Sequence, residues 1–237
     1  MDMLNELSVI VPAYNEEKTI ITVLEALLEN VPDIFEIIVV DDGSVDKTCQ
    51  VVDEYSSRLK NGGNIVLLKQ GLNRGKTAAV KTGIQASKGS IVIIQDADLE
   101  YNPEDIPSVI HPIQTGQADV VYGSRFLVRK ASRVLYFRHH LANKLITFLS
   151  NLVTDINLTD VETGYKAFKG DLIRGLSLTS SGFGFEIEIT AKISKLKCRI
   201  YEVPISYYGR TYEEGKKIGW RDGVSAIYYI FRYNFFM

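Results

Sequence analysis

The sequence predicts an α/β fold with a mostly parallel central sheet and helices on both faces. Two observations lead to this prediction. Short β-rich runs alternate with stretches of helical spacing through the first half of the chain. The runs are apolar on both faces, which is typical of buried parallel strands. The length of 237 residues, with 46% hydrophobic and 24% charged residues, suits one such globular domain.

The first part of the pattern consists of two strands and two helices. Leu7–Pro12 is an apolar run and predicts a strand, and Glu16–Asn30 carries aliphatic side chains at helical spacing. Glu36–Val40 is a second apolar run, which ends at Asp41-Asp42-Gly43-Ser44. Residues 46–59 then predict a second helix.

The next part continues the alternation. Ile65–Leu68 predicts a third strand, and Lys76–Ser87 predicts a helix with an alanine-rich face. Ser90–Gln95 predicts a fourth strand. Asn102-Pro103-Glu104 opens another helix, because proline is favoured in a first helical turn. Asp119–Tyr122 predicts a fifth strand.

Polar clusters follow three of these strands at the point where each ends. They are Ala13-Tyr14-Asn15-Glu16, Asp41-Asp42-Gly43-Ser44 and Asp96-Ala97-Asp98. In open α/β sheets, ligands bind outside the carboxyl ends of the strands. The sequence therefore predicts a ligand site at this edge.

Asp96 and Asp98 are the central pair of this predicted site. Side chains at i and i+2 of an extended chain point the same way, and two converging carboxylates repel each other unless a cation lies between them. Mg²⁺ and Mn²⁺ prefer oxygen ligands and often bridge carboxylates to phosphates. Glu100 is a candidate third ligand. The alternative is a solvated acidic turn.

The turn Asp41-Asp42-Gly43-Ser44 is a second candidate ligand-binding element. Asp42 is suited to accept hydrogen bonds from a base or ribose, while Ser44 or Asp46 caps the following helix; the alternative is an ordinary βα turn.

Gly75-Lys76-Thr77 looks like the end of a phosphate-binding P-loop, but position 70 is Gln70 where that motif needs glycine. We therefore exclude a P-loop.

The composition and charge indicate which classes of partner and which cellular location to expect. The 27 Lys and Arg against 29 Asp and Glu give a net charge of −2, so we expect no nucleic acid partner. Cys49 and Cys198 form no CxxC or zinc pattern, which indicates reduced thiols and a cytoplasmic location. No secretory signal and no membrane-spanning run is visible.

The second half carries two candidate membrane-contacting segments. Residues 120–154 contain no acidic residue, and 135–153 form a basic amphipathic pattern. The chain then ends in an aromatic-rich segment, Ile227–Phe236, and interfacial aromatic residues suit a headgroup region. The alternative is that both segments pack on the domain.

Several motifs occur together in one order. They are Val11–Glu16, Asp41–Ser44, Asn73–Lys76, Asp96–Glu100, Gly123–Phe126, Thr163–Phe168, Phe185–Glu188 and Glu202–Ile205. In this combination, over roughly residues 7–222, the chain resembles the family 2 inverting glycosyltransferases of GT-A fold. More narrowly, it is similar to dolichol-phosphate mannose synthases and bacterial polyprenyl-phosphate glycosyltransferases.

This resemblance implies roles for individual residues. Nucleotide-sugar binding is implied for Pro12, Tyr14, Glu16, Asp42, Lys76, Asp96, Asp98 and Arg210. Metal binding, as Mg²⁺ or Mn²⁺, is implied for Asp96, Asp98 and Glu100. Arg125, with Arg138 or His139, is expected to bind an acceptor phosphate. Asp96, Asp98, Arg125 and Arg210 are the expected catalytic residues.

The function implied is metal-dependent, inverting transfer of a sugar from a nucleotide-diphosphate sugar, of the GDP-mannose or UDP-glucose type, to a polyprenyl phosphate. The alternatives are transfer to a sugar hydroxyl, with a base from Asp96–Glu100 or from Glu186 and Glu188, and a non-catalytic nucleotide-sugar-binding module. For Glu186 and Glu188, the other interpretation is a solvated helix start. We expect one domain over 1–237, with a donor half (7–122), an acceptor half (123–222) and a C-terminal helix (223–237). We also expect peripheral contact with the cytoplasmic face of a membrane, and a membrane-protein partner.

Overall fold

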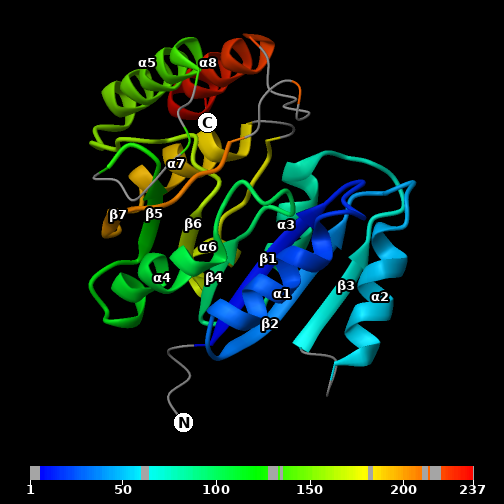
Figure 1. The fold of residues 1–237 in the computed structure, drawn as a ribbon. Coiled ribbons are helices and arrows are strands. Elements are labelled where there is room, and N and C mark those ends of the chain that lie inside the picture. The colour runs from blue at the N-terminus through cyan, green and yellow to red at the C-terminus, as the bar shows by residue number, and fades with distance from the viewer. Residues whose placement is uncertain are drawn as a thin grey trace.

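The structure is a computed structural model that describes residues 6–59, 64–127, 133, 136–180, 184–209, 213 and 220–236. Within these residues, seven strands form one sheet with helices on both faces (Figure 1). The strands are β1 (Leu7–Ala13), β2 (Ile34–Asp41), β3 (Ile65–Lys69), β4 (Ile91–Ile94), β5 (Val120–Ser124), β6 (Lys166–Lys169) and β7 (Ile200–Pro204). The predicted α/β fold is therefore confirmed.

The strand order in the sheet is β3-β2-β1-β4-β6-β5-β7. Strand β1 pairs in parallel with β2 and β4, β2 pairs in parallel with β3, and β5 pairs in parallel with β7. Strand β6 lies between β4 and β5 and is antiparallel to both. The sheet is thus mostly parallel, as predicted, with one reversed strand near its middle.

Helices cover the two faces and the ends of this sheet. They are α1 (Ile20–Asn30), α2 (Thr48–Arg58), α3 (Lys76–Ala86), the short 3-10 helix η3 (Pro103–Asp105), α4 (Ile106–Gln114), α5 (Phe137–Thr154), α6 (Gly170–Arg174), α7 (Phe185–Ser194) and α8 (Trp220–Phe235).

The first helix is shorter than the sequence predicts, because the residues before it belong to the site edge. Asn15 has a positive φ of 56°, and its N–H donates to Ser44 Oγ at 2.9 Å. The N–H of Glu16 donates to Thr48 Oγ1 at 2.8 Å. These bonds join the turn after β1 to the turn after β2, so α1 begins only at Ile20.

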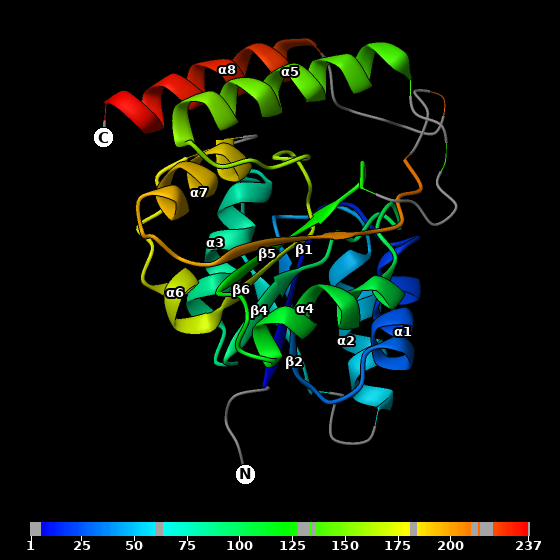
Figure 2. The ribbon, with the colours of Figure 1, turned by 90° about the vertical axis from the view of Figure 1, so that its left-hand side faces the viewer.

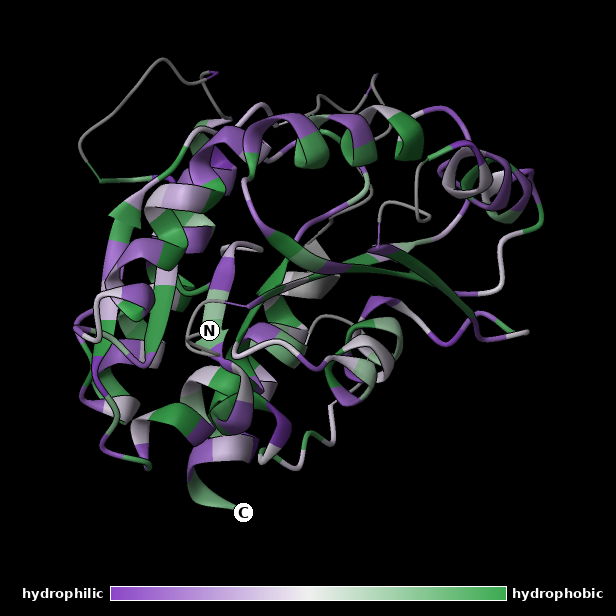
Figure 3. Cartoon of the chain, turned by 90° about the horizontal axis from the view of Figure 1, so that it is seen from below, coloured by the Kyte–Doolittle hydropathy of each residue, from purple (hydrophilic) through white to green (hydrophobic). Residues whose placement is uncertain are grey.

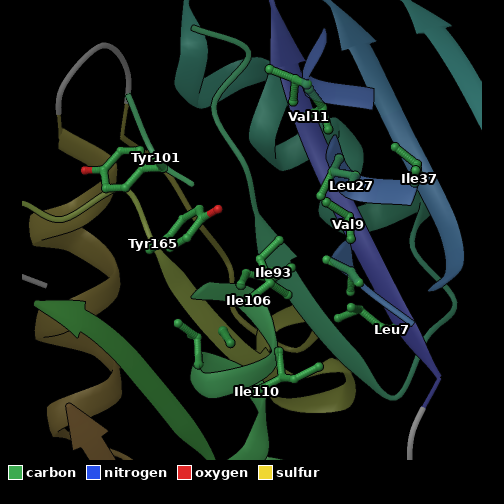
Figure 4. Close-up of a cluster of buried hydrophobic side chains, with 14 of the residues drawn as sticks. Leu7, Val9, Val11, Leu27, Ile37, Ile93, Tyr101, Ile106, Ile110 and Tyr165 are labelled. Carbon is green, nitrogen blue, oxygen red and sulfur yellow. The ribbon is translucent and has the colours of Figure 1, made fainter. Parts of the chain in front are cut away.

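The core lies on both faces of the sheet. In β1, Val9 and Val11 pack into one hydrophobic cluster with Leu27 of α1 (Figure 4), while Ile10 packs into the other cluster with Val80 of α3. All seven residues of β1 are buried, as expected for a central parallel strand. Figure 3 shows the hydrophobic colour gathered in the strands and mixed colouring on the surrounding helices.

Helices α5 and α8 pack side by side and form an outer layer above α7 (Figures 1 and 2). Ala226, Ile230 and Tyr233 of α8 are buried toward the domain. Large apolar side chains on both helices are nevertheless exposed; they are Phe137, Leu141, Leu145, Phe148 and Leu152 of α5, and Val224, Tyr228, Phe231 and Phe235 of α8. Among the described residues, no helix combines the length and apolar character that crossing a bilayer requires.

Candidate active site

A cavity of about 420 Å³ lies at the carboxyl ends of β1, β2 and β4, which is the edge the sequence predicts. Most of the predicted site residues line it. They are Pro12, Tyr14, Glu16, Asp42, Lys76, Asp96, Asp98, Glu100 and Arg125. The topology thus brings residues from both halves of the chain to one place.

Asp96 and Lys76 form the ion pair at the centre of this cavity. The Lys76 ammonium lies 2.6 Å from Oδ1 and 2.8 Å from Oδ2 of Asp96. Burial alone would lower the pKa of Lys76, but the carboxylates of Asp96, Glu186 and Asp98 together raise it above its ordinary value. Lys76 is therefore a fixed positive charge beside the Asp96–Asp98 pair.

The donor atoms at this point suit a hard divalent cation. Asp96 and Asp98 both line the cavity, and the carboxylate of Asp96 is already neutralised by a cationic group. Mg²⁺ keeps several waters and typically takes one or two protein carboxylates plus substrate phosphates. The two aspartates, with phosphate oxygens and water, fit such an ion.

Glu100 does not complete a three-carboxylate cluster. Its Oε2 accepts a hydrogen bond from the Tyr207 hydroxyl at 2.6 Å. In the part of the chain that the structure describes, no three Asp, Glu, His or Cys side chains gather as a metal-binding group. Asp96 and Asp98 thus remain the two candidate metal ligands, and Glu100 lies on the cavity wall.

Asp42 lines the cavity, and its carboxylate holds the loop that carries Lys76. Oδ1 accepts from the N–H of Arg74 at 2.9 Å, and Oδ2 accepts from the N–H of Gly75 at 2.7 Å. Gly75 has a φ of 88° and immediately precedes α3. Asp42 therefore fixes the start of α3, and with it the position of Lys76.

Arg125 follows β5 directly and is held by a buried carboxylate. Its Nε and Nη2 donate to the two oxygens of Asp160 at 2.6 and 2.7 Å, and its backbone N–H donates to the same carboxylate at 3.1 Å. The guanidinium also lies 5.1 Å from the ring centroid of Tyr207. Burial opposes the charge, but Asp160 raises the pKa of Arg125 well above its ordinary value.

Arg138, His139 and Arg210 are the other residues that the sequence predicts to bind phosphate groups. Neither Arg138 nor His139 is among the residues that line the cavity; Arg138 is exposed, and the His139 ring lies 5.6 Å from the ring of Tyr136. Arg210 lies outside the described residues.

Two other basic side chains of α5, His140 and Lys144, contact Phe126, the residue that follows Arg125. The His140 ring lies 4.9 Å from the ring of Phe126, the neighbour of Arg125, and Lys144 Nζ lies 4.9 Å from the same ring. These two positions are four residues apart and therefore share one face of the helix.

Several cavity residues are not predicted from the sequence as site residues. They are Asn73, Thr77, Tyr101, Glu162, Gly164, Phe185 and Tyr207. Tyr101 stacks on Tyr165, and its hydroxyl accepts from the N–H of Gly164 at 2.7 Å. The motif Thr163–Phe168 is the signal that could have placed Gly164 and its neighbours here.

Glu186 and Glu188 have separate environments, although both lie in the first turn of α7. Glu186 lines the cavity. Glu188 is fully buried and accepts hydrogen bonds from the N–H groups of Thr179 and Ser180, each at 2.7 Å, and from Lys192. Burial alone would raise the pKa of Glu188, but these hydrogen bonds lower it to about 2. A solvated helix start, one of the two expectations, is therefore wrong for Glu188.

Comparison with known proteins agrees with this geometry. Residues 8–176 match the family model described as glycosyl transferase family 2. The chain is 31% identical over 222 residues to an undecaprenyl-phosphate mannosyltransferase of Micrococcus luteus, covering 89% of this chain and 86% of that protein. It is 29% identical to a dolichol-phosphate mannosyltransferase of Pyrococcus furiosus, covering 90% of this chain but 60% of that longer protein.

The fold is shared with a solved enzyme. Glucosyl-3-phosphoglycerate synthase from Mycobacterium tuberculosis, in complex with Mn²⁺, UDP and phosphoglyceric acid, superposes with a TM-score of 0.74 at 20% identity, covering 97% of this chain and 78% of that one. The α/β architecture is thus the GT-A architecture expected from the motifs. With the family model spanning most of the chain, this protein belongs to glycosyl transferase family 2.

Proposed function

We propose that this glycosyltransferase transfers a hexose from a nucleotide-diphosphate sugar to a polyprenyl phosphate, with inversion at the anomeric carbon and with a divalent cation at Asp96 and Asp98. The observation that carries this proposal is the cavity itself. One space collects the carboxylate pair of Asp96 and Asp98, the ammonium of Lys76 and the buried guanidinium of Arg125. Relatives named for transfer to undecaprenyl and dolichol phosphate support the acceptor.

The donor side of the cavity is suited to a diphosphate. Asp96 and Asp98 would hold the cation, which when bound would neutralise the charge that develops as the diphosphate leaves. Lys76, fixed by Asp96 and by the loop that Asp42 holds, adds a second positive charge at the same place. Pro12, Tyr14 and Glu16 provide the wall for the nucleoside.

The acceptor side needs positioning more than proton transfer, because a phosphate monoester is already anionic at neutral pH. Asp160 occupies the Nε and Nη2 edge of Arg125 and fixes the direction of the guanidinium. Held in this way, Arg125 orients one phosphate oxygen toward the anomeric carbon. That oxygen forms the new bond while the bond to the diphosphate breaks, so no covalent enzyme intermediate is needed.

The exposed apolar faces of α5 and α8 offer a route for a lipid acceptor. Phe148 is 61% exposed and Leu152 is 69% exposed on α5, and Phe235 is 62% exposed on α8. Monomeric proteins rarely expose this many large apolar side chains on two adjacent helices, and α5 carries no acidic residue. We propose that this surface lies in the headgroup region of an anionic membrane, where Arg138 and Lys144 add electrostatic attraction.

The function is tested with purified protein, undecaprenyl phosphate in detergent, Mn²⁺ or Mg²⁺, and separate UDP- and GDP-sugars. We expect one nucleotide sugar to yield a glycosyl-phosphoryl lipid by mass spectrometry, and its formation to stop with EDTA. Asp96→Ala and Asp98→Ala should each abolish transfer, while Asp171→Ala, at an exposed position, should not. Transfer to a sugar hydroxyl with none to the lipid phosphate would refute the acceptor.

A further inference from the structure

The cavity wall from the second half of the chain contains a carboxylate that the proposed transfer does not use. Glu162 lines the cavity, and its Oε1 is buried without a hydrogen-bond partner among the described residues. Leaving a buried acceptor unsatisfied destabilises a protein, so an atom of this kind in a ligand cavity points to a donor that arrives with the ligand.

The electrostatic surroundings of Glu162 restrict what that ligand is. Burial, and then repulsion from Glu186, raise the pKa of Glu162 above its ordinary value. Lys166 is fully buried, donates to the backbone oxygen of Thr163 and offsets part of this negative charge. The wall around Glu162 is thus unfavourable for a further anion.

The position of Glu162 places it next to the donor side. Two residues later, a Cβ added at Gly164 would lie 3.0 Å from Oδ2 of Asp96, so the 162–164 segment runs directly beside the carboxylate pair. A sugar joined to a diphosphate at Asp96 and Asp98 would extend along this segment. The acceptor phosphate belongs instead with Arg125, because Glu186 and the burial of the wall around Glu162 disfavour a further anion here.

Hydroxyl groups are the donors that a sugar offers to a carboxylate. We propose that Glu162 determines donor specificity by accepting a hydrogen bond from a hydroxyl of a neutral hexose, and that Glu162 and Glu186 together exclude hexuronic acids. This inference rests on the proposed function for the identity of the donor. It adds a class of sugar to that proposal, since a hexuronate would bring its own carboxylate against Glu186 and into the buried wall around Glu162.

Binding without an acceptor tests the inference. The dissociation constants of UDP, UDP-glucose and UDP-glucuronate, and of GDP, GDP-mannose and GDP-mannuronate, are measured calorimetrically with Mn²⁺. For the better-bound series, we expect the wild type to favour the hexose over the hexuronate at least about tenfold. Because burial raises the pKa of Glu162 to about 8, its carboxyl group is largely uncharged at neutral pH. Glu162→Leu should therefore weaken hexose binding by about 2- to 10-fold, the range for a hydrogen bond between uncharged groups, and leave binding of the plain nucleotide unchanged.

A second readout separates recognition from a structural role. Because Oε1 has no hydrogen-bond partner in the part of the chain that the structure describes, Glu162→Gln and Glu162→Leu should leave the melting temperature unchanged or raise it, as is common at functional sites. A structural residue would lower it. Glu202→Gln is the matched control, since Glu202 is another half-buried glutamate of this half of the chain, does not line the cavity and accepts from the N–H of Thr159. This change should not alter the preference for hexose.

Three results would overturn the inference: equal binding of hexose and hexuronate by the wild type, an unchanged preference in both Glu162 variants, or the same loss in Glu202→Gln. Failure of the lipid transfer assay alongside intact sugar discrimination would refute the acceptor alone. Binding of the plain nucleotides but of none of their sugar conjugates would refute the donor and this inference together.

Discussion

Removing the carboxylate of Asp160 is the most informative single perturbation of this site. Asp160 is fully buried, the Arg125 side chain is 11% exposed, and three hydrogen bonds join them. Loss of one partner from a buried ion pair costs about 3–5 kcal/mol, because the remaining charge stays buried without compensation. We therefore expect Asp160→Ala to lower the free energy of unfolding by about that amount.

The assay is urea unfolding followed by far-ultraviolet circular dichroism at neutral pH. Asp171→Ala is the matched control, because Asp171 also pairs with an arginine, Arg174, at 2.8 Å but is fully exposed. An exposed pair contributes about 0–1 kcal/mol. A cost for Asp160→Ala no greater than that for Asp171→Ala would refute the reasoning.

A double-mutant cycle then isolates the pair. Arg125→Met should also destabilise strongly, since it leaves the Asp160 carboxylate buried alone. Combining Arg125→Met with Asp160→Ala should lower the free energy of unfolding by less than the sum of the two single changes, because neither charge remains. Purely additive effects would show that the two side chains do not stabilise each other.

Three further predictions concern other parts of the molecule. Glu188→Gln should lower the free energy of unfolding at pH 7, measured in urea, by about 3 kcal/mol. The reason is that the pKa of Glu188 is about 2 in the folded protein, below its ordinary value of 4.5. This stabilisation is present above pH 4.5 and is lost as pH falls toward 2, so a difference from wild type that stays constant down to pH 3 would contradict it. Gly164→Ala should lower kcat/KM at least about tenfold, because the added Cβ would lie 3.0 Å from Asp96 Oδ2 in the cavity; unchanged kinetics would show that the methyl group is accommodated. Phe148→Glu should reduce flotation with anionic liposomes, whereas Leu196→Glu, at a comparably exposed position off this surface, should not; equal flotation of both would rule out α5 as the membrane contact.

The strands and helices of the first half are predictable from local pattern alone. β1, β2 and β4 are short apolar runs, and each is followed by the polar turn that marks the site edge. The β6 strand, Lys166–Lys169, is not recognisable in the same way, because Lys166 occupies a core position with no exposed surface. Its charge is tolerated through nearby carboxylates that are distant in sequence, including Glu186.

Site residues, like the strands, can be predicted where the signal lies in neighbouring residues and cannot be predicted where it depends on a distant one. Asp96 and Asp98 are found because their spacing and their place after a strand are both visible in the sequence. Asp160 is not found, because its role depends on Arg125, which lies 35 residues earlier. A carboxylate recognised only by a distant partner carries no local signal.

The reversed strand β6 explains why sequence reasoning missed one wall of the cavity. The rule that ligands bind at carboxyl ends of strands directs attention to residues that follow a strand. Because β6 is antiparallel to β4 and β5, with Lys166 opposite Tyr122 and Lys169 opposite Ile91, its beginning lies at the edge where β4 and β5 end. The residues that precede β6, including Glu162 and Gly164, therefore reach the same edge as the residues that follow its neighbours. In a mixed sheet of this kind, the search for site residues has to include the segment before every antiparallel strand as well as the segment after every parallel one.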